Sequence, residues 1–153
     1  MNLTIEVAKR PDGCGVLRCT RADGSVTWEK REKHAGFFAL HDLTHFAVES
    51  ALGFNRGFFG LIAEGWEIAD TTGKGKQGPL SEEARIVEQL VGLFDREQSN
   101  GAPFPFSEFN KHCAPRVFTD AEMARVRALK AELAARWFGL DSKCTLELKF
   151  QRA

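Results

Sequence analysis

Polar and apolar residues alternate along the first 32 residues of the chain, and this pattern predicts β-strands. Leu3, Ile5 and Val7 alternate with polar neighbours, which is the period of a strand with one buried face. The dipeptides Asp12-Gly13 and Asp23-Gly24 separate this segment from two further alternating segments. Because Asp-Gly is a common turn between paired strands, we expect residues 1–32 to form a β-meander of three short strands.

The period then changes to that of α-helices, and residues 37–138 are predicted to be mainly helical. Apolar residues recur at helical spacing from Phe37 to Leu52, and a shorter helix is expected over residues 58–67. Ser81 is placed to cap a third long helix, with two glutamates in its first turn. The capping box that begins at Thr119 predicts the start of a further helix.

The last segment, residues 143–151, alternates again and is predicted to be a strand. A short amphipathic strand pairs more readily at the edge of an antiparallel sheet than in the middle of a parallel one. We therefore expect one α+β domain over residues 1–153. Its small antiparallel sheet consists of the N-terminal meander and the C-terminal strand, and four to five helices pack on it.

Composition and charge exclude several classes of partner. The chain has 153 residues, with 21 basic and 21 acidic side chains, so no overall positive field favours nucleic acid or an anionic membrane surface. The alternating N-terminus does not resemble a signal peptide, and no apolar run is long enough for a membrane span. We expect a cytoplasmic protein without a nucleic-acid or membrane partner, in which the four cysteines are reduced.

The residues with the clearest chemistry are His41-Asp42-Leu43-Thr44-His45, which lie within the first predicted helix. Side chains four residues apart project from the same face of a helix, so the two imidazoles can bind one ion, zinc or another divalent metal. Glu49 continues the row by one more turn and is expected to support His45 by accepting a hydrogen bond. Alternatively, Asp42 is the N-cap of this helix, and His41 then lies outside it.

The same five residues resemble the His-Glu-Leu-Thr-His zinc helix of the thermolysin-like gluzincins. The resemblance implies that His41 and His45 are zinc ligands and that Asp42 is the general base. It also implies a third ligand about twenty residues further on, which is Glu64, or Glu67 as the alternative. Asp42 is one methylene shorter than the family's glutamate, and the chain has no tyrosine.

A wider run, from Phe38 to Asp42 and from Gly57 to Leu61, is similar to an uncharacterised family of bacterial proteins, which implies no particular activity. The adjacent pair His41-Asp42 also resembles the dyad of HD-type phosphohydrolases. That family is all-helical and needs a further upstream histidine, for which only His34 is available.

Two alternatives need no histidine metal site. Cys14 and Cys19 have a spacing that could form half of a zinc site. The paired phenylalanines, which are more often core residues, could instead line a groove or a homodimer contact: Phe37, Phe38, Phe58 and Phe59. The sequence thus leaves two functions open, a metal-dependent hydrolase and a non-enzymatic interaction or ligand-binding domain without a metal.

Overall fold

The computed structural model describes residues 2–32 and 35–152, and it confirms the predicted α+β architecture. The strands are β1 (Asn2–Lys9), β2 (Gly15–Arg21), β3 (Val26–Arg31) and β4 (Thr145–Gln151). They form one antiparallel sheet in the order β3-β2-β1-β4, so the C-terminal strand pairs with β1 as expected. Leu3 lies opposite Arg21 on one side and Phe150 on the other.

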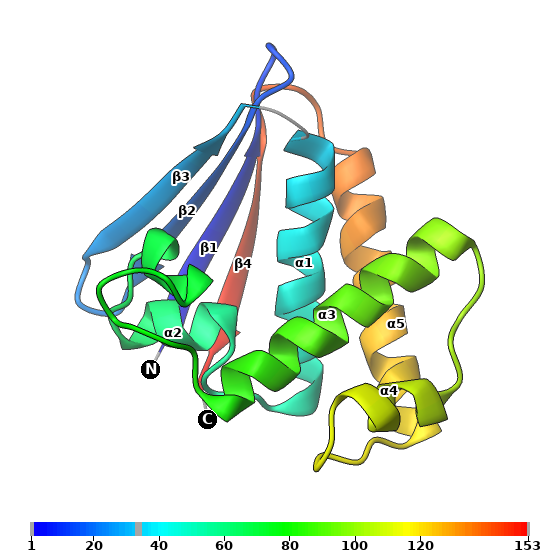
Figure 1. Ribbon diagram of the computed structural model, residues 1–153. Helices are drawn as coiled ribbons and strands as arrows, with labels where there is room; N and C mark the ends of the chain where they lie inside the picture. Colours follow the sequence, from blue (N-terminus) through cyan, green and yellow to red (C-terminus); the bar gives the residue numbers. More distant parts are fainter. Residues whose placement is uncertain (1, 33–34, 153) are drawn as a thin grey trace.

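One face of the sheet is apolar because the strands alternate in polarity. Leu3, Ile5 and Val7 of β1 are buried, as are Leu146 and Phe150 of β4. The other face carries the polar members of each alternation, and those of β4 are exposed. The helices therefore pack on one face only, as Figure 1 shows.

The helices are α1 (Ala35–Leu52), α2 (Phe58–Glu64), α3 (Glu82–Asn100), α4 (Phe106–His112) and α5 (Asp120–Phe138). A 3-10 helix, η1 (Ile68–Thr72), follows α2. Two of the predicted caps are present: Ser81 accepts a hydrogen bond from the backbone N–H of Ala84, and Thr119 forms the capping box of α5. The second helix ends three residues earlier than predicted, because Gly65 adopts a φ of 121° and breaks the helical path.

Helix α1 occupies the centre of the molecule. It contacts β2 and β4 of the sheet on one side, and α3 and α5 on the other (Figure 1). Every residue from Asp42 to Glu49 is buried, so a helix surrounded by protein carries several polar side chains. Buried polar groups are costly unless they are paired, so these side chains need partners within the protein or in a ligand.

No described helix has both the length and the apolar character needed to cross a membrane.

Candidate metal centre

Helix α1 begins at Ala35, six residues before His41. His41 therefore lies inside the helix, one turn before His45, and Asp42 is not an N-cap. The two imidazole rings lie with their centroids 4.9 Å apart, edge to face. The pairing that the spacing predicted is thus present.

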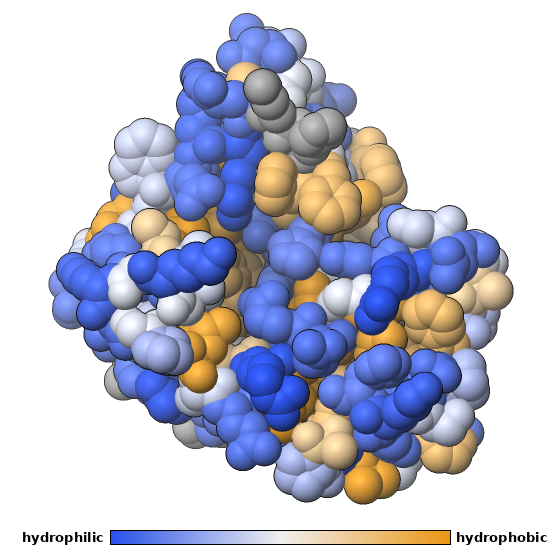
Figure 2. Space-filling view, viewed as in Figure 1, coloured by the Kyte–Doolittle hydropathy of each residue, from blue (hydrophilic) through white to orange (hydrophobic). Residues whose placement is uncertain are grey.

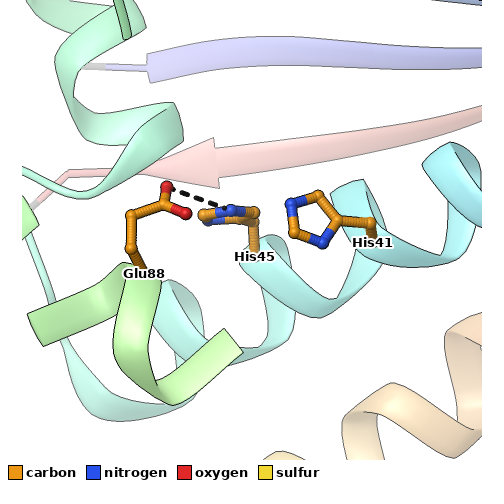
Figure 3. A group of neighbouring side chains, drawn as sticks. All are labelled: His41, His45 and Glu88. Carbon is orange, nitrogen blue, oxygen red and sulfur yellow. Dashed lines mark ion pairs between the residues drawn. The ribbon is translucent and has the colours of Figure 1, made fainter. Parts of the chain in front are cut away.

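A third side chain, Glu88 of α3, lies beside the two histidines. In the described part of the chain, one set of three histidine, cysteine or acidic side chains could hold a metal ion, and we call it the metal group: His41, His45 and Glu88. Their ligand atoms all lie within 4.8 Å of one another. His45 Nε2 lies 3.3 Å from Glu88 Oε1. Figure 3 shows the three side chains turned toward one another, two from α1 and one from α3. Two imidazoles and one carboxylate form a donor set that zinc and other divalent transition metals accept.

His41 is partly exposed, and its Nδ1 lies 2.7 Å from Asp95 Oδ2. Burial lowers the pKa of His41, but the hydrogen bond and the negative charge of Asp95 outweigh it, and the net shift is upward. Asp42 and Glu88 add to the upward shift. A metal at this imidazole must therefore compete with a proton.

His45 is almost completely buried, with 2 % of its side chain exposed. Burial lowers its pKa to about 4, so the ring is neutral at pH 7 and has a lone pair for a metal. Its Nδ1 has no hydrogen-bond partner among the described residues. Glu49 Oε2 lies 3.4 Å from this nitrogen, but the two atoms do not have hydrogen-bond geometry.

Glu49 is held in place by the start of α2. Its Oε1 accepts hydrogen bonds from the backbone N–H groups of Phe59 (3.0 Å) and Gly60 (3.1 Å). Burial nevertheless raises its pKa to about 8, against the effect of these donors. The carboxyl lies beside His45, as the predicted support of that histidine requires. The hydrogen bond from His45 to Glu49 stays a prediction.

Asp42 is also buried, although it does not belong to the group of His41, His45 and Glu88. Its Oδ1 lies 3.6 Å from Arg31 Nη2, and burial raises its pKa to about 7 although Arg31 opposes the shift. Asp42 lines the same pocket as the two histidines. Its role as a general base stays a prediction.

The two glutamates expected as the third ligand lie elsewhere. Glu64 binds Arg56 (3.1 Å) and Arg152 (2.8 Å). Glu67 caps η1 and forms an ion pair with Arg21 at 3.7 Å. Neither belongs to the group of His41, His45 and Glu88, so their role as a third ligand stays a prediction without support from this geometry.

Sequence reasoning missed Glu88 because it comes from another helix. One signal was available: Val87 and Val91, on either side of it, belong to the buried stripe of α3. A glutamate at the border of a buried stripe can reach a neighbouring helix, but the sequence does not say which one.

The metal group opens into a pocket of about 320 Å³ between α1, α2, η1 and β3. Figure 2 shows the surface hollowed in this region, with hydrophilic residues along much of the hollow. Arg31, Thr71 and Thr72 contribute polar groups to the pocket, and its apolar wall consists of Phe38, Phe58, Ile68, Ala69 and Leu80.

The phenylalanine pairs separate into core and pocket residues. Phe59 is buried in the core, whereas Phe58 is partly buried and packs against the ring of His45 at 5.0 Å. Phe38 lies under the guanidinium of Arg31, and Phe37 is 58 % exposed. The four residues therefore do not form one groove.

The remaining candidates are not members of the metal group among the residues described. Cys14 and Cys19 are free and belong to no group that can hold a metal among the residues described. His112 lies on α4 and pairs with Glu108 at 3.4 Å. His34 lies outside the described residues.

Comparisons of the chain with protein-family models, with curated proteins and with solved structures found no match.

Proposed function

We propose that this protein binds one divalent metal ion through His41, His45 and Glu88 and acts as a metal-dependent hydrolase on a substrate held in the adjoining pocket. The observation that carries the proposal is the convergence of three ligand atoms within 4.8 Å at the wall of a pocket of about 320 Å³. Catalytic zinc sites commonly have three protein ligands and leave a position open to water or substrate.

The donor set fits a metal on grounds of its own chemistry. His45 is neutral at pH 7, and His41 has its Nδ1 bound to Asp95 so that its other nitrogen is free to coordinate. Glu88 adds one negative charge. A metal held there would supply Lewis-acid chemistry, which lowers the pKa of a coordinated water from about 15.7 to about 7.

The chain's own residues would orient and assist this chemistry. The apolar wall around Phe58 and Leu80 keeps bulk water away from part of the pocket, while Thr71 and Thr72 offer hydroxyl groups to a substrate. Asp42 is the candidate base in the proposed reaction, as the resemblance to the gluzincin helix implies, because it lines the same pocket. The pocket does not distinguish peptide, ester and phosphoester substrates.

Metal binding is tested first, with metal-stripped protein and defined amounts of Zn²⁺, Mn²⁺, Fe²⁺ and Ni²⁺. Elemental analysis gives the stoichiometry, and competition with a chromophoric chelator gives the Kd. We expect one ion per chain in the wild type and loss of binding in His41→Ala, His45→Ala and Glu88→Gln. Glu64→Gln is the matched control, since Glu64 binds two arginines away from the group, and it should bind as the wild type does.

Hydrolysis is tested separately, with chromogenic ester, phosphoester and peptide substrates and the protein loaded with the metal that binds best. Turnover that is lost in Asp42→Asn while metal affinity is kept would support Asp42 as the base. Tight binding without turnover on any substrate class would refute the hydrolase and leave the metal site. A wild type that binds no metal would refute both, and would favour the alternative of a metal-free binding domain.

A further inference from the structure

We infer that Asp95 is a positioning residue for the metal centre: its carboxylate holds His41 in the tautomer and orientation that present Nε2 to the metal. The inference rests on the proposed metal site and adds a residue that lies outside the group of three ligands. It follows from one short contact and from the spacing of two acids along α3.

The contact is the 2.7 Å separation between His41 Nδ1 and Asp95 Oδ2. A carboxylate only accepts hydrogen bonds, so the shared hydrogen lies on Nδ1. In neutral imidazole the lone pair then lies on Nε2. Figure 3 shows this second ring nitrogen of His41 on the side of His45 and Glu88. Histidine ligands of metals commonly donate their other N–H to a carboxylate, which fixes the tautomer and the ring orientation.

The spacing of two acidic residues along α3 explains how this one helix contacts both histidines. Glu88 and Asp95 are seven residues apart, close to two full turns, so they lie on the same side of α3. The helical rise separates them by about 10 Å along the axis, against about 6 Å between His41 and His45 on α1. The two acids therefore flank the histidines, with Glu88 at His45 and Asp95 at His41.

Asp95 is partly exposed, so its contribution to folding is small and its effect on His41 can be measured separately. The carboxylate is at the border of the protein, with 23 % of the side chain exposed, beside a small cavity of about 130 Å³ that His41 also lines. If the side chain of residue 95 is truncated to alanine, water can fill the space that the carboxylate leaves. The Asp95→Ala variant is thus expected to fold, and the main change should be the loss of the hydrogen bond to His41.

The experiment compares Asp95→Ala and Asp95→Asn with the wild type, and uses Glu108→Gln as the control. Glu108 pairs with His112 four residues away on the surface helix α4, so this variant also removes the charge of a histidine's carboxylate partner, but outside the pocket. Two quantities are measured: the tautomer of His41 in metal-free protein, by ¹⁵N NMR of the imidazole nitrogens at a pH where the ring is neutral, and the Kd for Zn²⁺ by chelator competition.

We expect His41 to carry its proton on Nδ1 in the wild type and to lose this preference in Asp95→Ala. The Kd for Zn²⁺ should rise by roughly 10- to 100-fold in Asp95→Ala, and by less in Asp95→Asn, whose amide oxygen still accepts. Glu108→Gln should leave both quantities of the metal site unchanged.

An unchanged His41 tautomer in Asp95→Ala would overturn the inference, as would wild-type Zn²⁺ affinity in that variant. Both results leave the proposed function intact if the wild type binds metal. A wild type without metal affinity refutes the proposed function instead, and the NMR comparison still decides whether Asp95 sets the tautomer of His41.

Discussion

Gly57 leaves the space that the carboxyl of Glu49 occupies, and Gly57→Ala should therefore destabilise the protein strongly. A Cβ at this position would lie 2.5 Å from Glu49 Cδ and 2.7 Å from its Oε1. The φ of Gly57 is −83°, which any residue can adopt, so backbone strain is not the reason. The reason is the fully buried carboxyl group, which has nowhere to move without leaving the backbone N–H groups of Phe59 and Gly60.

The expected cost follows from the hydrogen bonds that are lost. Two bonds to a buried carboxyl, at about 1.5 kcal/mol each, give about 3 kcal/mol of lost unfolding free energy. For a domain of this size, this corresponds to a decrease in Tm of roughly 6–12 °C. Urea denaturation in EDTA measures the change without any contribution from a bound metal.

Gly92→Ala is the matched control, because Gly92 lies inside α3 and a Cβ added there would have nothing within 4 Å. The same substitution should there stabilise the helix by roughly 0.5–1 kcal/mol. Opposite signs at the two glycines would support the reasoning. Equal urea midpoints for Gly57→Ala and the wild type would refute it, as would a full effect of Gly57→Ala in a Glu49→Ala background, where the obstructing carboxyl is absent.

Two further predictions concern charge and metal. The pKa of Asp42 is raised by burial to about 7 from an ordinary 3.8, so its contribution to stability is full below about pH 4 and is lost as the pH rises through 7. Metal-free wild type should therefore lose more unfolding free energy than Asp42→Asn between pH 4 and pH 8; parallel urea midpoints across this range would contradict the raised pKa. Zn²⁺ at 100 times its Kd should stabilise the wild type by about 2.7 kcal/mol, seen as a higher Tm that EDTA reverses, and a Tm that does not respond to Zn²⁺ would count against the site.

The fold could be predicted from the sequence because its signals are local. The alternation of Leu3, Ile5 and Val7 identifies a strand with one buried face, and that face is the one packed against the helices. The caps at Ser81 and Thr119 marked the starts of α3 and α5, since the capping side chain and the N–H it binds are three residues apart. The 3-10 helix η1 was missed, because its capping box joins Glu67 and Asp70 in a segment without apolar periodicity.

The candidate site could be predicted only for the part that lies on one helix. His41, His45 and Glu49 share a face of α1, so their proximity follows from helical geometry alone. Glu88 and Asp95 depend on how α3 packs against α1, which is a long-range property that periodicity does not encode. The choice of Glu64 relied on the spacing within another family's fold, and here α2 directs that side chain to Arg56 and Arg152.

The polar side chains of α1 and the glutamate that faces them from α3 differ in what they require, and this difference separates residues of the fold from residues of the site. Thr44 donates to the backbone oxygen of Leu40, and Glu49 accepts from α2, so both are satisfied by the protein itself. Glu88 is different, because 42 % of its side chain is exposed and water can solvate its carboxylate without any contact to His45.

A residue that serves the fold should cost stability when it is changed, and one that serves a ligand should cost affinity. In EDTA we expect Glu88→Gln to stay within about 0.5 kcal/mol of the wild type, as an ordinary exposed substitution does. Glu49→Ala should lose about 3 kcal/mol or more, because it leaves two buried N–H groups unpaired. Zn²⁺ should then distinguish the two variants in the opposite way. Glu88→Gln should show no gain in Tm when Zn²⁺ is added, because it lacks a ligand, whereas Glu49→Ala keeps all three ligands and should show a gain. If Glu88→Gln proved as destabilising in EDTA as Glu49→Ala, the contact of Glu88 with His45 would belong to the fold, and the group of three would need no metal to explain it.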